Sequence, residues 1–219
     1  MSASRYKDPQ DHLLGMIQEG EHEHQDFKFE ISDTYKIAKT LSAFANTGGG
    51  RLLIGVKDNG RIAGVRSQEE AYMIEAAAQR CCVGQVDYTL RDVIVDGKTV
   101  LVADIGESKV KPVLALDNSR GQWAYVRVKD ENILASPVHL ALWKQQNDPD
   151  GQLTAISEGE QALIRQIAGA PEGLTLNQAC HLSTLSRRRL ISLMARLVRY
   201  QMVSIRHTER GFVFQSASD

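Results

Sequence analysis

The chain has 219 residues, of which 42% are hydrophobic and 24% charged, with a formal net charge of −1. This composition is that of an ordinary globular protein with enough residues to bury a core. No apolar run approaches the roughly 18 residues of a membrane span, and the first residues lack the apolar stretch of a secretion signal, so we expect a cytoplasmic protein without a membrane partner. The three cysteines, two of them adjacent, fit neither a disulfide framework nor paired zinc ligands.

The net charge is unevenly distributed along the chain. Residues 151–219 contain arginine but no lysine and carry a net charge of +3, whereas residues 1–150 carry −4. A polar, turn-rich stretch with the sequence NDPDG lies between the two regions. We therefore predict a first domain over residues 1–147, a linker over residues 148–156 and a second domain over residues 157–219.

The hydrophobic pattern of the first domain predicts helices and strands in an irregular order. Apolar residues recur at helical spacing in residues 33–47, and a short apolar strand follows at residues 52–56. The turn Asp58-Asn59-Gly60 then predicts a hairpin whose return strand is residues 61–65. Further helices are expected at residues 11–20, 68–80 and 136–145, and further strands around residues 26–30, 86–95, 99–105 and 123–128. This order is typical of an α+β fold rather than of a regular βαβ series.

A glycine run, Gly48-Gly49-Gly50, ends the helix at residues 33–47. Glycines allow left-handed backbone and close approach of the chain, so a structural turn is the main interpretation. A glycine-rich turn beside a strand also suggests a phosphate site, formed here by Asn46, Gly48 and Gly49. However, the run follows a helix and precedes a strand, the reverse of the dinucleotide and Walker motifs, and GxxxxGK[ST] does not occur in the chain. Nucleotide binding is therefore the weaker alternative.

Acidic residues occur before the long helix and again after the strand that follows it: Glu21, Glu23, Asp26 and Asp58. If the two strands beside these acids pair, the carboxylates converge at one end of the sheet, an arrangement that holds Mg²⁺ or Mn²⁺ for phosphodiester cleavage. The alternative is that they are solvated charges beside turns. His22 and His24 lie two residues apart on a strand but lack a third obvious ligand, so they do not predict a metal site.

The second domain begins with two capping-box sequences, Ser157-x-x-Glu160 and Thr175-x-x-Gln178, each followed by an apolar periodic run. They predict helices that start near residues 158 and 176, and Ser186 can cap a third helix. A hairpin is expected from the strands at residues 203–206 and 212–214. Three short helices followed by a hairpin is the order of a winged helix-turn-helix domain.

Arginine is concentrated on the third predicted helix, which would be the recognition helix of such a domain. The residues expected to contact nucleic acid are Arg188, Ser192 and Arg199 facing a major groove, Arg187 and Arg189 in the first turn near a phosphate, and Arg210 at the tip of the hairpin. DNA binding is favoured because the arginines of this helix lie on its outward face instead of being spread over the domain. The alternative is a solvated face on a domain that mediates protein contacts.

Several stretches of the first domain form a specific combination. They are GEHEHQDFK at residues 20–28, AFANTGG at residues 43–49, LIGV at residues 53–56, DNGRIAG at residues 58–64, Lys111-Pro112, and Tyr125-Val126-Arg127. In this combination, over about residues 12–145, the chain resembles the Schlafen-type AlbA-like domain. That family has the pattern GESxxxEFK, a helix, AFANTxGGxLxIGVxDxGxIxG, a KP loop and a YxR strand.

The resemblance implies a mixed-sheet α+β domain that binds nucleic acid, which in bacterial chains is often joined to a C-terminal winged helix and described as a transcriptional regulator. Some such chains carry an ATP-binding label. In the eukaryotic Schlafen nucleases three carboxylates cleave tRNA and rRNA, and at the matching positions this chain has Glu21, Asp26 and Asp58 as catalytic and metal-binding candidates. Two departures put this chemistry in doubt: His22 replaces the usual Ser, and Asp26 is one methylene shorter than the usual Glu. The vertebrate enzymes clamp RNA with two copies of the fold, so a homo-oligomer is expected here.

We predict a nucleic-acid-binding protein, with DNA or RNA as its partner, that acts as a transcriptional regulator. In the first domain Lys28, Lys109, Lys111 and Arg127 are the expected phosphate contacts. One alternative is a Mg²⁺- or Mn²⁺-dependent endoribonuclease that acts on structured RNA such as tRNA. A second is an ATP- or nucleotide-sensing module at residues 46–50.

Overall fold

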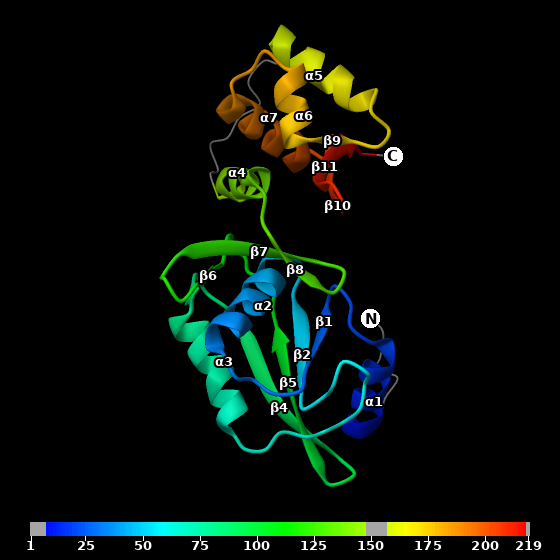
Figure 1. The fold of residues 1–219 in the computed structure, drawn as a ribbon, viewed down its shortest axis with the longest axis vertical. Helices are drawn as coiled ribbons and strands as arrows, with labels where there is room; N and C mark the ends of the chain where they lie inside the picture. Colours follow the sequence, from blue (N-terminus) through cyan, green and yellow to red (C-terminus); the bar gives the residue numbers. More distant parts are fainter. Residues whose placement is uncertain (1–7, 148–156, 218–219) are drawn as a thin grey trace. The chain divides into compact units, whose positions relative to one another are not determined.

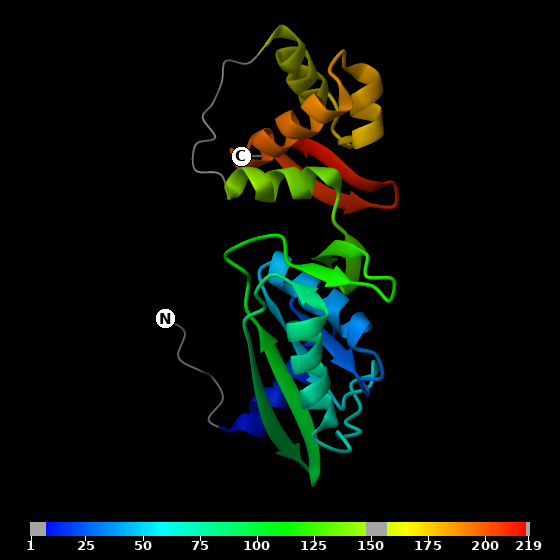
Figure 2. The same ribbon diagram turned by 90° about the vertical axis from the view of Figure 1, so that its left-hand side faces the viewer.

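The computed structural model of the protein describes residues 8–147 and 157–217. The chain divides into two compact units, the first ending at Leu134 and the second beginning at Ala135 (Figures 1 and 2). The predicted linker, residues 148–156, lies outside the described residues. None of the helices in the described part of the chain is both long and apolar enough to cross a membrane.

The first unit mixes helices and strands, as the sequence predicts. Its elements are α1 (Pro9–Glu19), β1 (Gln25–Lys28), α2 (Thr34–Asn46), β2 (Gly50–Ile54), α3 (Glu69–Arg80), β3 (Cys82–Val83), β4 (Tyr88–Val95), β5 (Lys98–Ile105), β6 (Leu114–Leu116), β7 (Gln122–Val128) and β8 (Glu131–Leu134). Helix α2, for example, begins after an N-capping residue: the carboxylate of Asp33 accepts hydrogen bonds from backbone N–H groups in the first turn of α2. The expected α+β class is confirmed.

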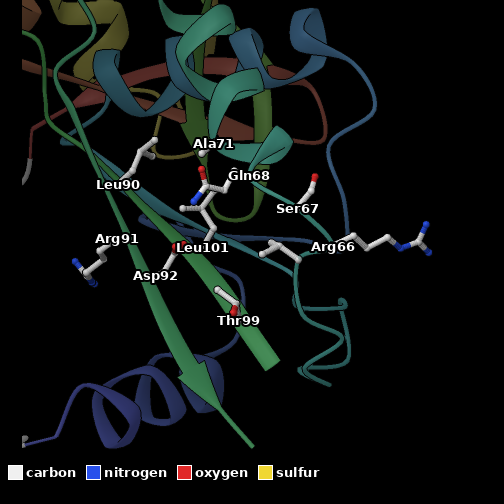
Figure 3. Close-up of a pocket in the computed structure, with 10 residues that line it drawn as sticks. Arg66, Ser67, Gln68, Ala71, Leu90, Arg91, Asp92, Thr99 and Leu101 are labelled. Carbon is white, nitrogen blue, oxygen red and sulfur yellow. The ribbon is translucent and has the colours of Figure 1, made fainter. Parts of the chain in front are cut away.

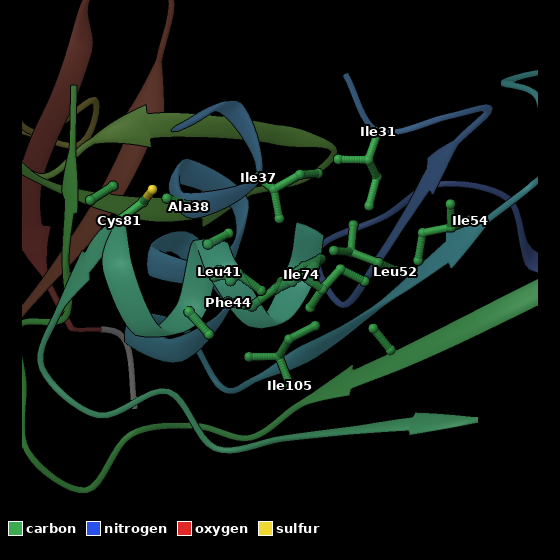
Figure 4. Close-up of a cluster of buried hydrophobic side chains, with 14 of the residues drawn as sticks. Ile31, Ile37, Ala38, Leu41, Phe44, Leu52, Ile54, Ile74, Cys81 and Ile105 are labelled. Carbon is green, nitrogen blue, oxygen red and sulfur yellow. The ribbon is translucent and has the colours of Figure 1, made fainter. Parts of the chain in front are cut away.

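The larger sheet of the first unit has the order β1-β2-β5-β4 and is mixed, because β1 and β2 are parallel whereas the other pairs are antiparallel. Helix α1 covers one face, where its Leu13 and Met16 pack in a cluster with Phe27. Helices α2 and α3 cover the other face, and Figure 4 shows Phe44 and Ile74 between these helices and the sheet. Burial of each such side chain contributes roughly 1.5–3 kcal/mol relative to exposure.

A second sheet, β3-β6-β7-β8, packs against α2 on the side away from the first sheet (Figure 1). The amide of Asn46, at the end of α2, joins this helix to the second sheet. Its Nδ2 donates to the carbonyl oxygens of Val113 and Tyr125, each at 2.9 Å, and its Oδ1 accepts from the N–H of Val113 at 2.9 Å. Ser42, one turn earlier, donates to Val113 and accepts from the N–H of Tyr125. Helix α2 is therefore enclosed by both sheets.

The predicted return strand at residues 61–65 does not form, and its pairing is reduced to one bridge between Val56 and Ile62. The N–H groups of Ala63 and Gly64 both donate to the carbonyl of Gly55, which folds the segment back on itself instead of continuing a ladder. The sequence also missed the short strands β3, β6 and β8: β3 pairs with the distant β6, whereas β6 and β8 pair with the neighbouring β7.

The second unit contains α4 (Pro137–Gln146), α5 (Glu158–Ala168), β9 (Leu174–Thr175), α6 (Leu176–Leu182), α7 (Arg187–Arg199), β10 (Val203–Thr208) and β11 (Gly211–Ser216). Both predicted capping boxes form at the starts of α5 and α6, and Ser186 caps α7. The strands make an antiparallel sheet in the order β10-β11-β9. The predicted hairpin is thus present, and β9 adds an unexpected third strand.

Helix α4 belongs to the second unit, although the sequence places it at the end of a first domain of residues 1–147. Its Val138 is fully buried in the same cluster as Leu190 and Leu193 of α7. The side chain of Gln145 donates to the backbone carbonyl of Ser192 at 3.0 Å. The division falls before α4 because its apolar side is buried against α7, a partner that sequence periodicity cannot identify.

Replacement of Asn46 by Ala should destabilise the first unit by roughly 2–4 kcal/mol, because buried groups of Val113 and Tyr125 lose their partners. Urea unfolding of the full chain measures this change. Asn118, exposed in the loop before β7, is the matched control, and Asn118→Ala should stay within about 0.5 kcal/mol of the wild type. Equal stabilities for Asn46→Ala and the control would show that the Asn46 amide does not stabilise the junction between α2 and the second sheet.

Candidate nucleic-acid interface

The two charged residues of the DFK stretch on β1, Asp26 and Lys28, form an ion pair. Asp26 is only 4% exposed. Its Oδ2 lies 2.8 Å from Nζ of Lys28, and its Oδ1 lies 3.4 Å from Nη2 of Arg127. The charged face of this strand is therefore not a solvated face, and both oxygens of Asp26 already contact cations.

Arg127 is a structural residue and not the phosphate contact that the sequence suggests. It is 2% exposed, and its Nη1 donates to Oδ1 of Asn132 at 2.9 Å. Its Nη2 donates to the backbone carbonyl of Gln25, and its guanidinium carbon lies 5.2 Å from the ring centre of Phe44. The side chain connects β7 to β1, where Asp26 supplies the charge that a buried guanidinium requires.

Glu21 lies beside Asp26 at the start of β1. Its Oε1 accepts a hydrogen bond from the N–H of Phe27 at 2.9 Å. Partial burial raises the pKa of Glu21, and the hydrogen bond and negative charge of Asp26 raise it further. Two of the three predicted catalytic acids are therefore neighbours, and Asp26 raises the pKa of Glu21.

The third acid, Asp58, lies in the exposed turn after β2. Within residues 8–147 and 157–217, no group of three His, Cys, Asp or Glu side chains is arranged to hold a metal ion. The structure therefore does not bring Glu21, Asp26 and Asp58 together as a metal site requires. The donor set does not fit Mg²⁺ or Mn²⁺, because the oxygens of Asp26 are engaged by Lys28 and Arg127.

The residues expected to bind a nucleotide use their polar groups within the fold. The amide of Asn46 is 4% exposed and serves the second sheet. A Cβ on Gly49 would lie 2.7 Å from the carbonyl oxygen of Ile105, and one on Gly48 would lie 3.1 Å from the ring of His24. These glycines allow close packing of the backbone, which supports the structural interpretation of the turn.

The basic loop between β5 and β6 is anchored to the end of α2, where the N–H of Ser108 donates to the carbonyl of Ala45 at 2.8 Å. Lys111 forms an ion pair with Glu107, and this contact lowers the pKa of the Glu107 carboxyl. Lys109 is exposed at the tip of the loop. Of the four cations predicted for this domain, Lys109 is thus best placed to meet a phosphate.

In the second unit, Arg187, Arg188 and Arg189 are exposed in the first turn of α7. Nη1 of Arg187 donates to Oδ1 of Asn177 at 3.0 Å, which fixes its direction. The N-terminal end of a helix carries a partial positive charge, so the three arginines lie where the field already favours an anion. Arg210 is also exposed at the turn between β10 and β11.

Part of the outward face of α7 is contacted by α4, which the sequence does not predict. Gln145 of α4 donates to both the carbonyl and, at 3.3 Å, the hydroxyl of Ser192. Nη1 of Arg199 in turn donates to the backbone carbonyl of Gln145. Ser192 and Arg199, which were expected to read a major groove, therefore contact the end of α4, although Ser192 stays exposed, as does Arg188.

A cavity of about 450 Å³ opens between the start of α3 and the β4–β5 hairpin. Leu90 and Leu101 line it, and in Figure 3 the side chains of Arg66 and Arg91 point away from it. Arg91 forms an ion pair with Asp104. The cavity thus lacks a cation directed inward and is not arranged as a phosphate site.

Comparison with known proteins gives one family match, which lies almost entirely in the first unit, and a structural similarity that extends over most of the chain. Residues 21–136 match the family model described as Schlafen, AlbA_2. Among solved structures, the chain is similar to the DIP2311 protein from Corynebacterium diphtheriae, with 18% identity and a TM-score of 0.47. The alignment covers 94% of this chain but 39% of that chain, so this protein spans about two-fifths of the length of that relative. No curated protein matches the sequence.

Substitution of Asp26 by Asn should lower the pKa of Glu21. The neighbouring negative charge that raises this pKa is removed, and Lys28 then acts on Glu21 without a competing carboxylate. An NMR titration of the glutamate carboxyl carbons measures the shift, and Glu23→Gln, which removes an exposed acid nearby, serves as control. A Glu21 pKa that stays the same or rises in Asp26→Asn would show that the two carboxyls are not coupled.

Proposed function

This chain belongs to the Schlafen AlbA_2 family, whose domains are associated with nucleic-acid binding, and from this premise we propose that it is a nucleic-acid-binding transcriptional regulator. The observation that carries the proposal is the run of three exposed arginines at the N-terminal end of α7. Consecutive exposed arginines at a helix N-terminus suit the phosphate backbone of a duplex.

The order of elements supports a winged helix as the second domain. Helices α5, α6 and α7 are followed by the hairpin of β10 and β11, which would be the wing. Arg210 at the turn of this hairpin adds a further cation. We propose that α7 and the hairpin together contact DNA, and that a homo-oligomer presents two such domains to one duplex.

The mode of binding differs from deep insertion of a recognition helix. Because Gln145 of α4 bonds to Ser192 and Arg199, part of the polar surface in the second half of α7 is already engaged within the unit. Contacts by the first turn and the wing reach mainly phosphates, which position a protein without specifying sequence. The proposed binding is therefore tolerant of sequence and strongly dependent on salt.

Endoribonuclease activity is the second candidate, favoured by the adjacent carboxyls of Glu21 and Asp26 at positions that match the nuclease motif. The engaged oxygens of Asp26 oppose it. We expect the wild type and Asp58→Ala to leave tRNA equally intact in the presence of Mn²⁺, as measured by gel electrophoresis. Cleavage by the wild type that Asp58→Ala abolishes would establish the nuclease and displace the proposal above.

Binding to duplex DNA should weaken with salt along a log–log slope of about −3 to −5, as expected when roughly three to five phosphates are neutralised per copy. Combined replacement of Arg187, Arg188 and Arg189 by Ala should reduce the magnitude of the slope by about 3. Fluorescence anisotropy between 50 and 200 mM salt, a range in which such contacts cost orders of magnitude in affinity, measures both slopes.

The control removes the same charge from exposed arginines of the first unit, with Arg61, Arg66 and Arg80 replaced by Ala. This variant should keep the wild-type slope on duplex DNA. A slope near zero for the wild type, or equal slopes for the two triple variants, would show that the start of α7 does not bind DNA.

A further inference from the structure

One of the two tryptophans of the chain lies on the surface of the first unit. Trp123 in β7 is 48% exposed, whereas Trp143 is 4% exposed. The indole of Trp123 is held in place, because its Nε1 donates to Oδ2 of Asp117 at 2.8 Å. A large flat ring is thus presented to water in a fixed orientation.

The loop before β7 is built to hold this ring. Oδ1 of Asp117 accepts hydrogen bonds from the N–H groups of Ser119 and Gly121, at 2.8 and 2.7 Å. The hydrogen bond from Trp123, followed by those from the loop, lowers the pKa of Asp117, so the carboxylate stays ionised. A Cβ on Gly121 would lie 2.5 Å from Oδ2 of Asp117 and 2.8 Å from Nε1 of Trp123, so a side chain at this position would displace the carboxylate or the indole.

Two cations, Lys39 and Arg120, are associated with the loop that holds the ring. Nζ of Lys39 on α2 is 5.8 Å from the ring centre of Tyr125, which lies two residues after Trp123 and so on the same side of β7. The charge of Lys39 also acts on Asp117, which places the ammonium close to the loop. Arg120 is exposed within the loop itself.

We propose that Trp123 is a stacking platform for an unpaired base of single-stranded nucleic acid, with Lys39 and Arg120 contacting the adjoining phosphates. This inference rests on the proposed nucleic-acid binding, and it specifies that the first unit binds the single-stranded form of nucleic acid. Every base has a π-face that can stack on an indole, whereas the bases of a duplex are already stacked on each other. A pre-oriented ring loses little conformational entropy on binding.

The surroundings of Trp123 favour a nucleic acid over a protein partner. Tryptophan at the centre of a protein interface is usually enclosed by a desolvated ring of neighbours. The groups that hold or flank Trp123 include the carboxylate of Asp117 and the exposed Arg120 and Gln122, besides its cross-strand partner Ala115. The carboxylate oxygens of Asp117 accept hydrogen bonds from the indole and from loop N–H groups. The negative charge is thus engaged within the loop.

The test is a titration of the full chain with ten-residue oligo(U) and oligo(dT) and with a mixed-sequence duplex. In a Trp143→Phe protein the emission reports Trp123 alone, and we expect both single strands, but not the duplex, to quench it. In the wild-type background Trp123→Ala should weaken binding of the single strands roughly 5- to 150-fold, since stacking contributes about that factor per base. Trp123→Phe keeps a ring that can stack and should lose much less.

Two further variants separate stacking from general damage. Gly121→Ala displaces the indole without removing it and should weaken single-strand binding, whereas Tyr72→Ala removes an aromatic ring that is 57% exposed on α3 and should change nothing. The platform would be overturned if Trp123→Ala bound single strands as tightly as the wild type and if single strands did not quench the Trp143→Phe protein. The proposed function would then still stand. A wild type that binds neither single strand nor duplex would overturn the proposed function as well.

Discussion

The buried amide of Asn46 is the interaction on which the arrangement of the first unit depends. It is the last residue of α2, and it satisfies backbone groups of the loop before β6 and of β7 at once. An amide side chain carries both donors and an acceptor, so it can bond to backbone N–H and C=O groups that have no neighbouring strand at this junction. The loop that carries Lys109 and the strand that carries Trp123 are the two segments that this amide connects to α2.

Charge in the first unit is used mainly to hold elements together. Asp26 binds Lys28 on its own strand and Arg127 on β7, so the acidic and basic residues of the matched family pattern neutralise each other inside the fold. Glu107 and Lys111 do the same in the basic loop. Surfaces available to a nucleic acid are therefore found where cations lack such partners in the described fold, at Lys109 and beside Trp123.

Local features of the fold could be predicted from the sequence, whereas contacts between distant segments could not. Helix starts depend on a capping side chain within three residues, and those at Asp33, Ser157, Thr175 and Ser186 were found correctly. The burial of Arg127 and the contact of Ser192 with Gln145 depend on partners that are remote in sequence, and the sequence predicts neither. The platform had a local signal that was overlooked, because Asp117, Gly121 and Trp123 lie within seven residues.

The central claim is that this protein contacts nucleic acid at two places with different preferences, an unpaired base at β7 and duplex phosphates at the start of α7. Photo-crosslinking of the full chain to a single strand containing 4-thiouridine, and to a duplex containing 4-thiothymidine, followed by mass spectrometry of the linked peptides, tests this claim most directly. The account predicts that the single strand links to the peptide containing Trp123 and that the duplex links to peptides beside Arg187–Arg189. Linkage of both probes to the same other surface, or to none, would contradict it.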